Sequence, residues 1–155
     1  MEQISKHLSF DECTRSETAN KMGIVNNNPN LSVIENMKAL AENVFEPLRA
    51  HFKVPIHVSS VFRSMNLNQA IKGSITSQHC SGQAMDIDNG DKGKPSNKEI
   101  FDYIKKNIKF DQLIWEFGTK ENPSWVHVSY SNQKNRGQIL KAKKINGKTH
   151  YENFK

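Results

Sequence analysis

Apolar side chains recur every three or four residues between positions 31 and 50, which is the spacing of one face of an amphipathic helix. Pro47 lies inside this segment, and because proline lacks a backbone N–H we expect the helix to bend just before it. We assign this helix to the core and predict no catalytic or binding role for it. Capping-box sequences predict two further helices, over residues 9–19 and from Ser96 onward. A short helix is also predicted over residues 67–71.

Apolar and polar residues alternate in several shorter segments, which is typical of strands with one buried face. Asn146-Gly147 separates the last two of these segments and is the strongest hairpin signal in the chain. The patterns together predict an α+β fold, with a small antiparallel sheet and helices packed on one side of it. The predicted strands cover residues 55–62, 83–88, 112–117, 125–130, 138–145 and 149–154.

The length of 155 residues fits one domain with its own core. We predict a single domain over 1–155, with an N-terminal helical segment at 1–30, the core at 31–130 and a basic C-terminal hairpin at 131–155. The two cysteines, Cys13 and Cys80, are too few for a disulfide framework, and we expect both to be reduced thiols.

The chain carries a net charge of +6, and much of the excess follows residue 130. This charge favours attraction to a polyanion without choosing among nucleic acid, membrane surface and cell-wall polymer. The sequence has no helix-turn-helix or aromatic-interleaved pattern, so we expect no specific nucleic-acid partner. The first ten residues have no apolar run of the signal-peptide type and no later segment is long enough to cross a bilayer, so we expect synthesis in the cytoplasm and no membrane insertion.

The segment from Ser77 to Asp88 places a histidine and a carboxylate among small residues, unlike ordinary core. We expect a loop carrying His79 to enter a strand in which Asp86 faces away from Met85 and Ile87. His127, in the strand that begins at Trp125, offers a second imidazole. Two histidines and an aspartate form a common zinc ligand set that leaves a position for water, so we predict one bound Zn²⁺ held by His79, Asp86 and His127.

A hydrolytic zinc site also needs a base near the water, and Glu116 on the strand before that of His127 is the best placed candidate. Arg63, at the end of an earlier strand, is the candidate cation for a substrate carboxylate or an oxyanion. Ser77 and Gln78 are candidate hydrogen-bonding partners of the substrate.

These residues resemble a known family. The pattern Ser77-x-His79-x-x-Gly82-x-Ala84-x-Asp86, preceded by Ser60-Val-Phe-Arg63-Ser64 and followed by Trp125-Val-His127, is similar to the zinc D-alanyl-D-alanine carboxypeptidases that share their fold with the hedgehog signalling domain. The similarity spans roughly 31–130 and is strongest to compact members from bacteriophages and their bacterial hosts. It implies a catalytic core with zinc bound at His79, Asp86 and His127, and Arg63 in contact with the substrate or the transition state.

Several branches of this family carry the catalytic acid three residues before the last zinc histidine, where this chain has Ser124. Either Glu116 takes that role, or the protein binds zinc and hydrolyses poorly. The resemblance implies a zinc peptidase that cleaves peptidoglycan stem peptides, as a D,D-carboxypeptidase or an endopeptidase. The alternative is a catalytically weak or inactive module that binds wall polymer or a protein. We expect a monomer that reaches the wall after release from the cell or as a virion component.

Overall fold

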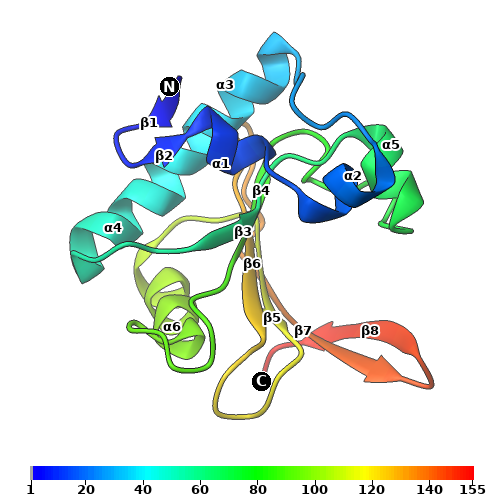
Figure 1. Ribbon diagram of the computed structural model, residues 1–155. Coiled ribbons are helices and arrows are strands. Elements are labelled where there is room, and N and C mark those ends of the chain that lie inside the picture. Colours follow the sequence, from blue (N-terminus) through cyan, green and yellow to red (C-terminus); the bar gives the residue numbers. More distant parts are fainter. Residues whose placement is uncertain (1) are drawn as a thin grey trace.

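Three of the predicted strands form the centre of one sheet in the computed structural model, which describes residues 2–155 (Figure 1). They are β4 (Ala84–Ile87), β5 (Gln112–Glu116) and β6 (Trp125–Ser129), and they pair antiparallel. The full strand order is β3-β4-β6-β5-β7-β8. The predicted α+β class is confirmed.

The C-terminal hairpin extends this sheet at one edge. β7 (Gln138–Ile145) and β8 (Lys148–Asn153) turn at Asn146-Gly147, as predicted. β7 pairs parallel to β5, however, so the sheet is mixed and, with six strands, larger than the small antiparallel sheet that we predicted. A parallel neighbour cannot be recognised from alternation, because the side-chain period is the same in both kinds of pairing.

One face of the sheet carries the hydrophobic core. Alternation in the central strands turns Met85, Leu113 and Val128 to this face, where each is fully buried. Figure 1 shows α4 and α6 on the same side of the sheet, with the β7–β8 hairpin extending to the other side. Besides strand residues, the core contains buried apolar side chains of the helices, among them Met37, Leu40, Val44, Phe45, Leu48, Ile100, Phe101 and Ile104.

The long core helix is present and has a wider turn where a bend was predicted. It consists of α3 (Leu31–Leu40), a π-helical turn η1 (Ala41–Phe45) and α4 (Glu46–Phe52). In this turn the N–H of Glu46 donates to the carbonyl of Ala41, five residues back. The helix therefore widens just before Pro47, which cannot donate a backbone hydrogen bond. The helix after Ser96 is also confirmed, as α6 (Asn97–Asn107) with the predicted capping box.

The N-terminal segment differs from its prediction in two ways. The expected helix over residues 9–19 is split into α1 (Phe10–Thr14) and α2 (Glu17–Met22), because Ser16 is extended and its side chain caps a new helix by accepting from the N–H of Ala19. A two-stranded hairpin, β1 (Gln3–Ser5) and β2 (Leu8–Ser9), precedes them and was not predicted.

The segment before the histidine motif is less regular than expected. The strand predicted over residues 55–62 is reduced to β3 (Val58–Ser60), which pairs with β4. The short helix α5 (Met65–Ala70) begins at a Ser64 cap, slightly earlier than predicted. Among residues 2–155, no helix has the length and apolar character needed to cross a bilayer.

Candidate metal centre and active-site cleft

Asp86 and His127 lie directly opposite each other on the antiparallel strands β4 and β6. Their chain neighbours Met85, Ile87 and Val126 are buried in the core, so both polar side chains project from the other face of the sheet. His127 Nδ1 lies 3.0 Å from Asp86 Oδ1. The strand pairing thus brings together two residues that are 41 positions apart in the chain.

His79 reaches the same point from the turn before β4 and is buried, with 3% of its surface exposed. Its Nδ1 lies 2.8 Å from the carbonyl oxygen of Val61. Because a carbonyl can only accept, Nδ1 carries the proton and Nε2 presents its lone pair. Nε2 faces the Oδ2 atom of Asp86 at 3.3 Å.

A glycine allows the His79 turn to pack closely against α3. Gly82 has a φ of +70°, and a Cβ at this position would lie 2.7 Å from the carbonyl oxygen of Val33. Both the backbone conformation and the close approach favour glycine. This residue therefore fixes the path of the chain between the histidine of the motif and its aspartate.

The three side chains form a compact donor set. His79, Asp86 and His127 each offer one ligand atom, and these atoms lie within 4.8 Å of one another. Burial by itself would raise the pKa of Asp86, but the facing imidazoles of His79 and His127 outweigh it and hold that pKa well below its usual range. Two imidazole nitrogens and an ionised carboxylate fit the preferences of Zn²⁺, with a position left for a further ligand.

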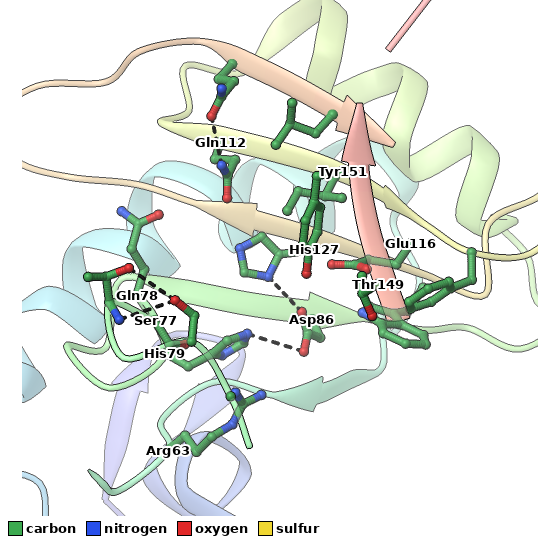
Figure 2. A pocket seen from close by; sticks show the side chains of 18 of the residues that line it. Arg63, Ser77, Gln78, His79, Asp86, Gln112, Glu116, His127, Thr149 and Tyr151 are labelled. Carbon is green, nitrogen blue, oxygen red and sulfur yellow. Dashed lines mark hydrogen bonds and ion pairs between the residues drawn. The ribbon is translucent and has the colours of Figure 1, made fainter. Parts of the chain in front are cut away.

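The donor set lies in a cleft of about 810 Å³ (Figure 2). The cleft crosses the polar face of the sheet and is bounded by the turn before β4 and by the C-terminal hairpin. All the site residues predicted from the sequence line it, namely Arg63, Ser77, Gln78, His79, Asp86, Glu116 and His127.

Glu116 projects into this cleft from β5, beside the strand of His127. Its backbone pairs with Trp125, so its side chain lies diagonally across from that of His127. Only 6% of its surface is exposed. Burial raises the pKa of Glu116 to about 7; the charge of Asp86 adds to this rise, and His127 partly offsets it.

Ser124 is exposed and lies outside the set of residues that line the cleft. Its backbone N–H donates to the carbonyl of Glu116 at 2.9 Å, so Ser124 lies where the turn between β5 and β6 ends and β6 begins. Position 124 thus offers no carboxylate to the cleft, and the neighbouring strand carries a buried one, Glu116.

Arg63 and Gln78 are both held by neighbouring polar groups. Arg63 Nη1 donates to Asn68 Oδ1 at 3.2 Å, and the Arg63 N–H donates to the carbonyl of His79 at 3.2 Å. Gln78 Nε2 donates to Asp111 Oδ2 at 3.0 Å, and Asp111 also accepts two side-chain hydrogen bonds from Arg136. Both cleft residues thus have defined orientations.

The C-terminal hairpin contributes cleft residues that were not predicted from the sequence. Lys144, Thr149 and Tyr151 line the cleft, and Figure 2 shows the Tyr151 side chain between those of His127 and Glu116. Alternation along β8 places residues 149 and 151 on one face, which is the signal that the sequence offered. The alternation did not show that this face would line the cleft, because the orientation of the hairpin depends on the parallel pairing of β7 with β5.

The family model described as peptidase M15 matches residues 6–129. The chain belongs to this family. The predicted resemblance to zinc D-alanyl-D-alanine carboxypeptidases is thereby confirmed, and peptidase M15 enzymes are zinc-dependent metallopeptidases that act on peptide substrates. A comparison with curated proteins finds no match for the chain. The matched segment includes the whole donor set and Glu116 but ends before the β7–β8 hairpin.

Proposed function

We propose that this peptidase M15 protein is a zinc-dependent enzyme that hydrolyses peptide bonds in peptidoglycan stem peptides, as a D,D-carboxypeptidase or an endopeptidase. Family membership supports the peptidase class. The observation that carries the proposal is that a zinc-type donor set and a separate buried carboxylate, Glu116, share one cleft. A purely structural metal site would need the donors but not the carboxylate beside them.

In this proposal His79 Nε2, the carboxylate of Asp86 and His127 Nδ1 hold the ion. The hydrogen bond from His79 to the carbonyl of Val61 fixes the tautomer that presents Nε2. Zinc bound there supplies Lewis acidity towards the scissile carbonyl and lowers the pKa of the attacking water.

Glu116 is the proposed general base. Its carboxylate takes one proton from the water as the water oxygen bonds to the scissile carbonyl carbon, and it returns that proton to the amine nitrogen as the C–N bond breaks. Burial favours the protonated form of Glu116, which suits a group that must hold a proton between the two steps. Arg63 would bind the substrate carboxylate or the oxyanion, while Ser77 and Gln78 would bind the peptide backbone.

The cell wall as target is supported by the family resemblance and by the net charge of +6, which favours contact with anionic wall polymers. We propose that the protein acts there as a monomer, after release from the producing cell or as part of a virion. If the cleft binds peptides without cutting them, the protein is instead a binding module of the wall.

The test combines metal analysis with mass spectrometry of digested muropeptides. We expect one zinc ion per chain and chelator-sensitive release of D-alanine or of a cross-link fragment. His79→Ala should lose zinc and activity, whereas His57→Ala, which changes an exposed histidine outside the cleft, should retain both. Glu116→Gln should retain zinc and lose turnover.

Two results would contradict parts of this proposal. Full activity of His79→Ala would remove zinc from the mechanism. A wild-type protein that contains zinc, is retained on purified peptidoglycan and cleaves no stem peptide would establish the binding module in place of the enzyme.

A further inference from the structure

The β7–β8 hairpin lies beyond the segment matched by the family model, yet it forms one wall of the cleft. Strand register explains how it reaches the site. Glu116 pairs with Ala142 of β7, and Ala142 pairs with Tyr151 of β8. Directly paired residues project from the same face of a sheet, so all three point to the side that carries Asp86 and His127.

Ala142 makes this arrangement possible. It lies between Glu116 and Tyr151 in the row of paired residues that crosses β5, β7 and β8, and it is fully buried. A methyl group at this position leaves room for the Tyr151 ring to lean across β7 towards β5. Figure 2 shows the result, with the hydroxyl end of Tyr151 turned into the cleft between His127 and Glu116.

The hairpin holds Tyr151 in place from the opposite face. Phe154 follows shortly after Tyr151, and its ring centroid lies 4.9 Å from that of Phe101 and 5.7 Å from that of Trp115. The Phe154 N–H also donates to the carbonyl of Ile139 at 3.0 Å. The end of β8 is thus anchored in the core while Tyr151 remains 56% exposed in the cleft wall, available to a bound peptide.

The electrostatic environment agrees with this geometry. Burial raises the pKa of Tyr151, and the charges of Glu116 and Asp86 raise it further. The phenol is therefore protonated at neutral pH and is a hydrogen-bond donor close to two acidic groups of the site. The phenol lines the same cleft as Glu116 and the metal donor set, so its hydroxyl is available to a peptide carbonyl bound there.

We propose that Tyr151 is a further catalytic residue, whose hydroxyl donates a hydrogen bond to the scissile carbonyl oxygen as negative charge develops on it. The inference rests on the proposed function and deepens it. Tyr151 stays protonated throughout, and the transferred proton passes through Glu116. The hairpin thus completes a site that the matched segment would leave open on one side.

The main test compares the wild type with Tyr151→Phe and Tyr151→Ala, with Tyr130→Phe as the matched control outside the cleft. Zinc content should be unchanged in all of them. Tyr151→Phe should lower kcat by about 10- to 100-fold with little change in KM, because the lost hydrogen bond forms in the transition state. Tyr130→Phe should behave like the wild type.

A binding measurement separates this inference from the proposed function. Acetohydroxamic acid binds zinc as its anion, whose oxygens accept a hydrogen bond from a donor near the metal, and calorimetry gives its affinity without any turnover. Tyr151→Phe should bind it several-fold more weakly than the wild type.

Equal acetohydroxamate affinity in the wild type and Tyr151→Phe would overturn the role of Tyr151 even if the enzyme is active. An inactive wild type that still shows the affinity loss would overturn the peptidase function but keep Tyr151 as a ligand donor. A loss confined to Tyr151→Ala would assign the effect to ring packing and reject the hydroxyl. A zinc-loaded wild type that cleaves no stem peptide and binds no acetohydroxamate would overturn both proposals.

Discussion

The burial of Glu116 predicts how its replacement changes stability with pH. Burial raises the folded-state pKa of Glu116 from 4.5 to about 7 in the metal-free protein. The folded chain therefore binds this proton more tightly than the unfolded chain does, and ionisation of Glu116 disfavours folding. At about 1.4 kcal/mol per pKa unit, this difference corresponds to about 3 kcal/mol.

Glu116→Gln removes the ionisation and keeps the shape of the side chain. At about pH 4 both proteins have a neutral group at position 116, so their difference in unfolding free energy takes its baseline value. As pH rises from 4.5 to about 7 the wild type loses stability and the variant does not. By about pH 8 the variant should have gained about 3 kcal/mol relative to the wild type, measured from that baseline.

Urea unfolding followed by tryptophan fluorescence, at several pH values and in the presence of a chelator, measures this difference. Glu121→Gln is the control, since Glu121 is an exposed carboxylate in the turn between the same two strands. Glu121→Gln should lack the gain in stability expected of Glu116→Gln. The argument that burial raises the pKa of Glu116 would be refuted if the Glu116→Gln difference were constant with pH or grew towards acid.

Two further predictions concern the frame of the cleft. Gly82→Ala should destabilise the protein and weaken zinc binding. Its loss of unfolding free energy, measured in urea, should exceed that of Gly147→Ala. Both glycines have positive φ, but a Cβ at Gly147 meets no atom within 4 Å. Equal losses would contradict the close approach. Asp111→Asn should cost about 1–2 kcal/mol near pH 7, since the pairing with half-exposed Arg136 is partly screened. The hydrogen bonds from Arg136, opposed by burial, lower the pKa of Asp111. The stabilisation by ionised Asp111 is therefore present above the ordinary carboxyl pKa and should be lost as pH falls through the lowered pKa of Asp111 in the folded protein. A destabilisation by Asp111→Asn that is the same at every pH would contradict this explanation.

The sequence indicated which side chains meet in the cleft better than it indicated how the sheet is paired. Alternation fixes which residues share a face within one strand, so Asp86 and His127 could be assigned to polar faces before the strands were paired. Capping boxes located the starts of two helices for the same local reason. Ser16 was missed because a serine inside a predicted helix gives no sign that it will cap a new one.

What the sequence could not show depends on long-range pairing. Nothing in residues 130–137 indicates that the chain crosses to the far side of β5 and runs parallel to it. The turn at Asn146-Gly147 was evident, yet its hairpin could only be described as basic. Tyr151 entered the cleft only when the register placed it beside Ala142, itself opposite Glu116. A hairpin signal defines a local pair, and its docking site is set by the rest of the fold.

If Glu116 is the base, as proposed, its position on β5 compensates for the serine at position 124. The β5–β6 pair offers two places from which a carboxylate could be supplied, the turn-side start of β6 and the cleft face of β5. Ser124 occupies the first and is exposed, whereas Glu116 occupies the second and is buried in the cleft that also holds the donor set. Glu116 on β5 has neighbours on both sides, β6 with His127 and β7 with Ala142, so its position depends on the C-terminal hairpin as well as on the matched segment. Glu116 and Tyr151 therefore belong to one row of the sheet, and a change in the hairpin is expected to affect the base and the proposed oxyanion donor together.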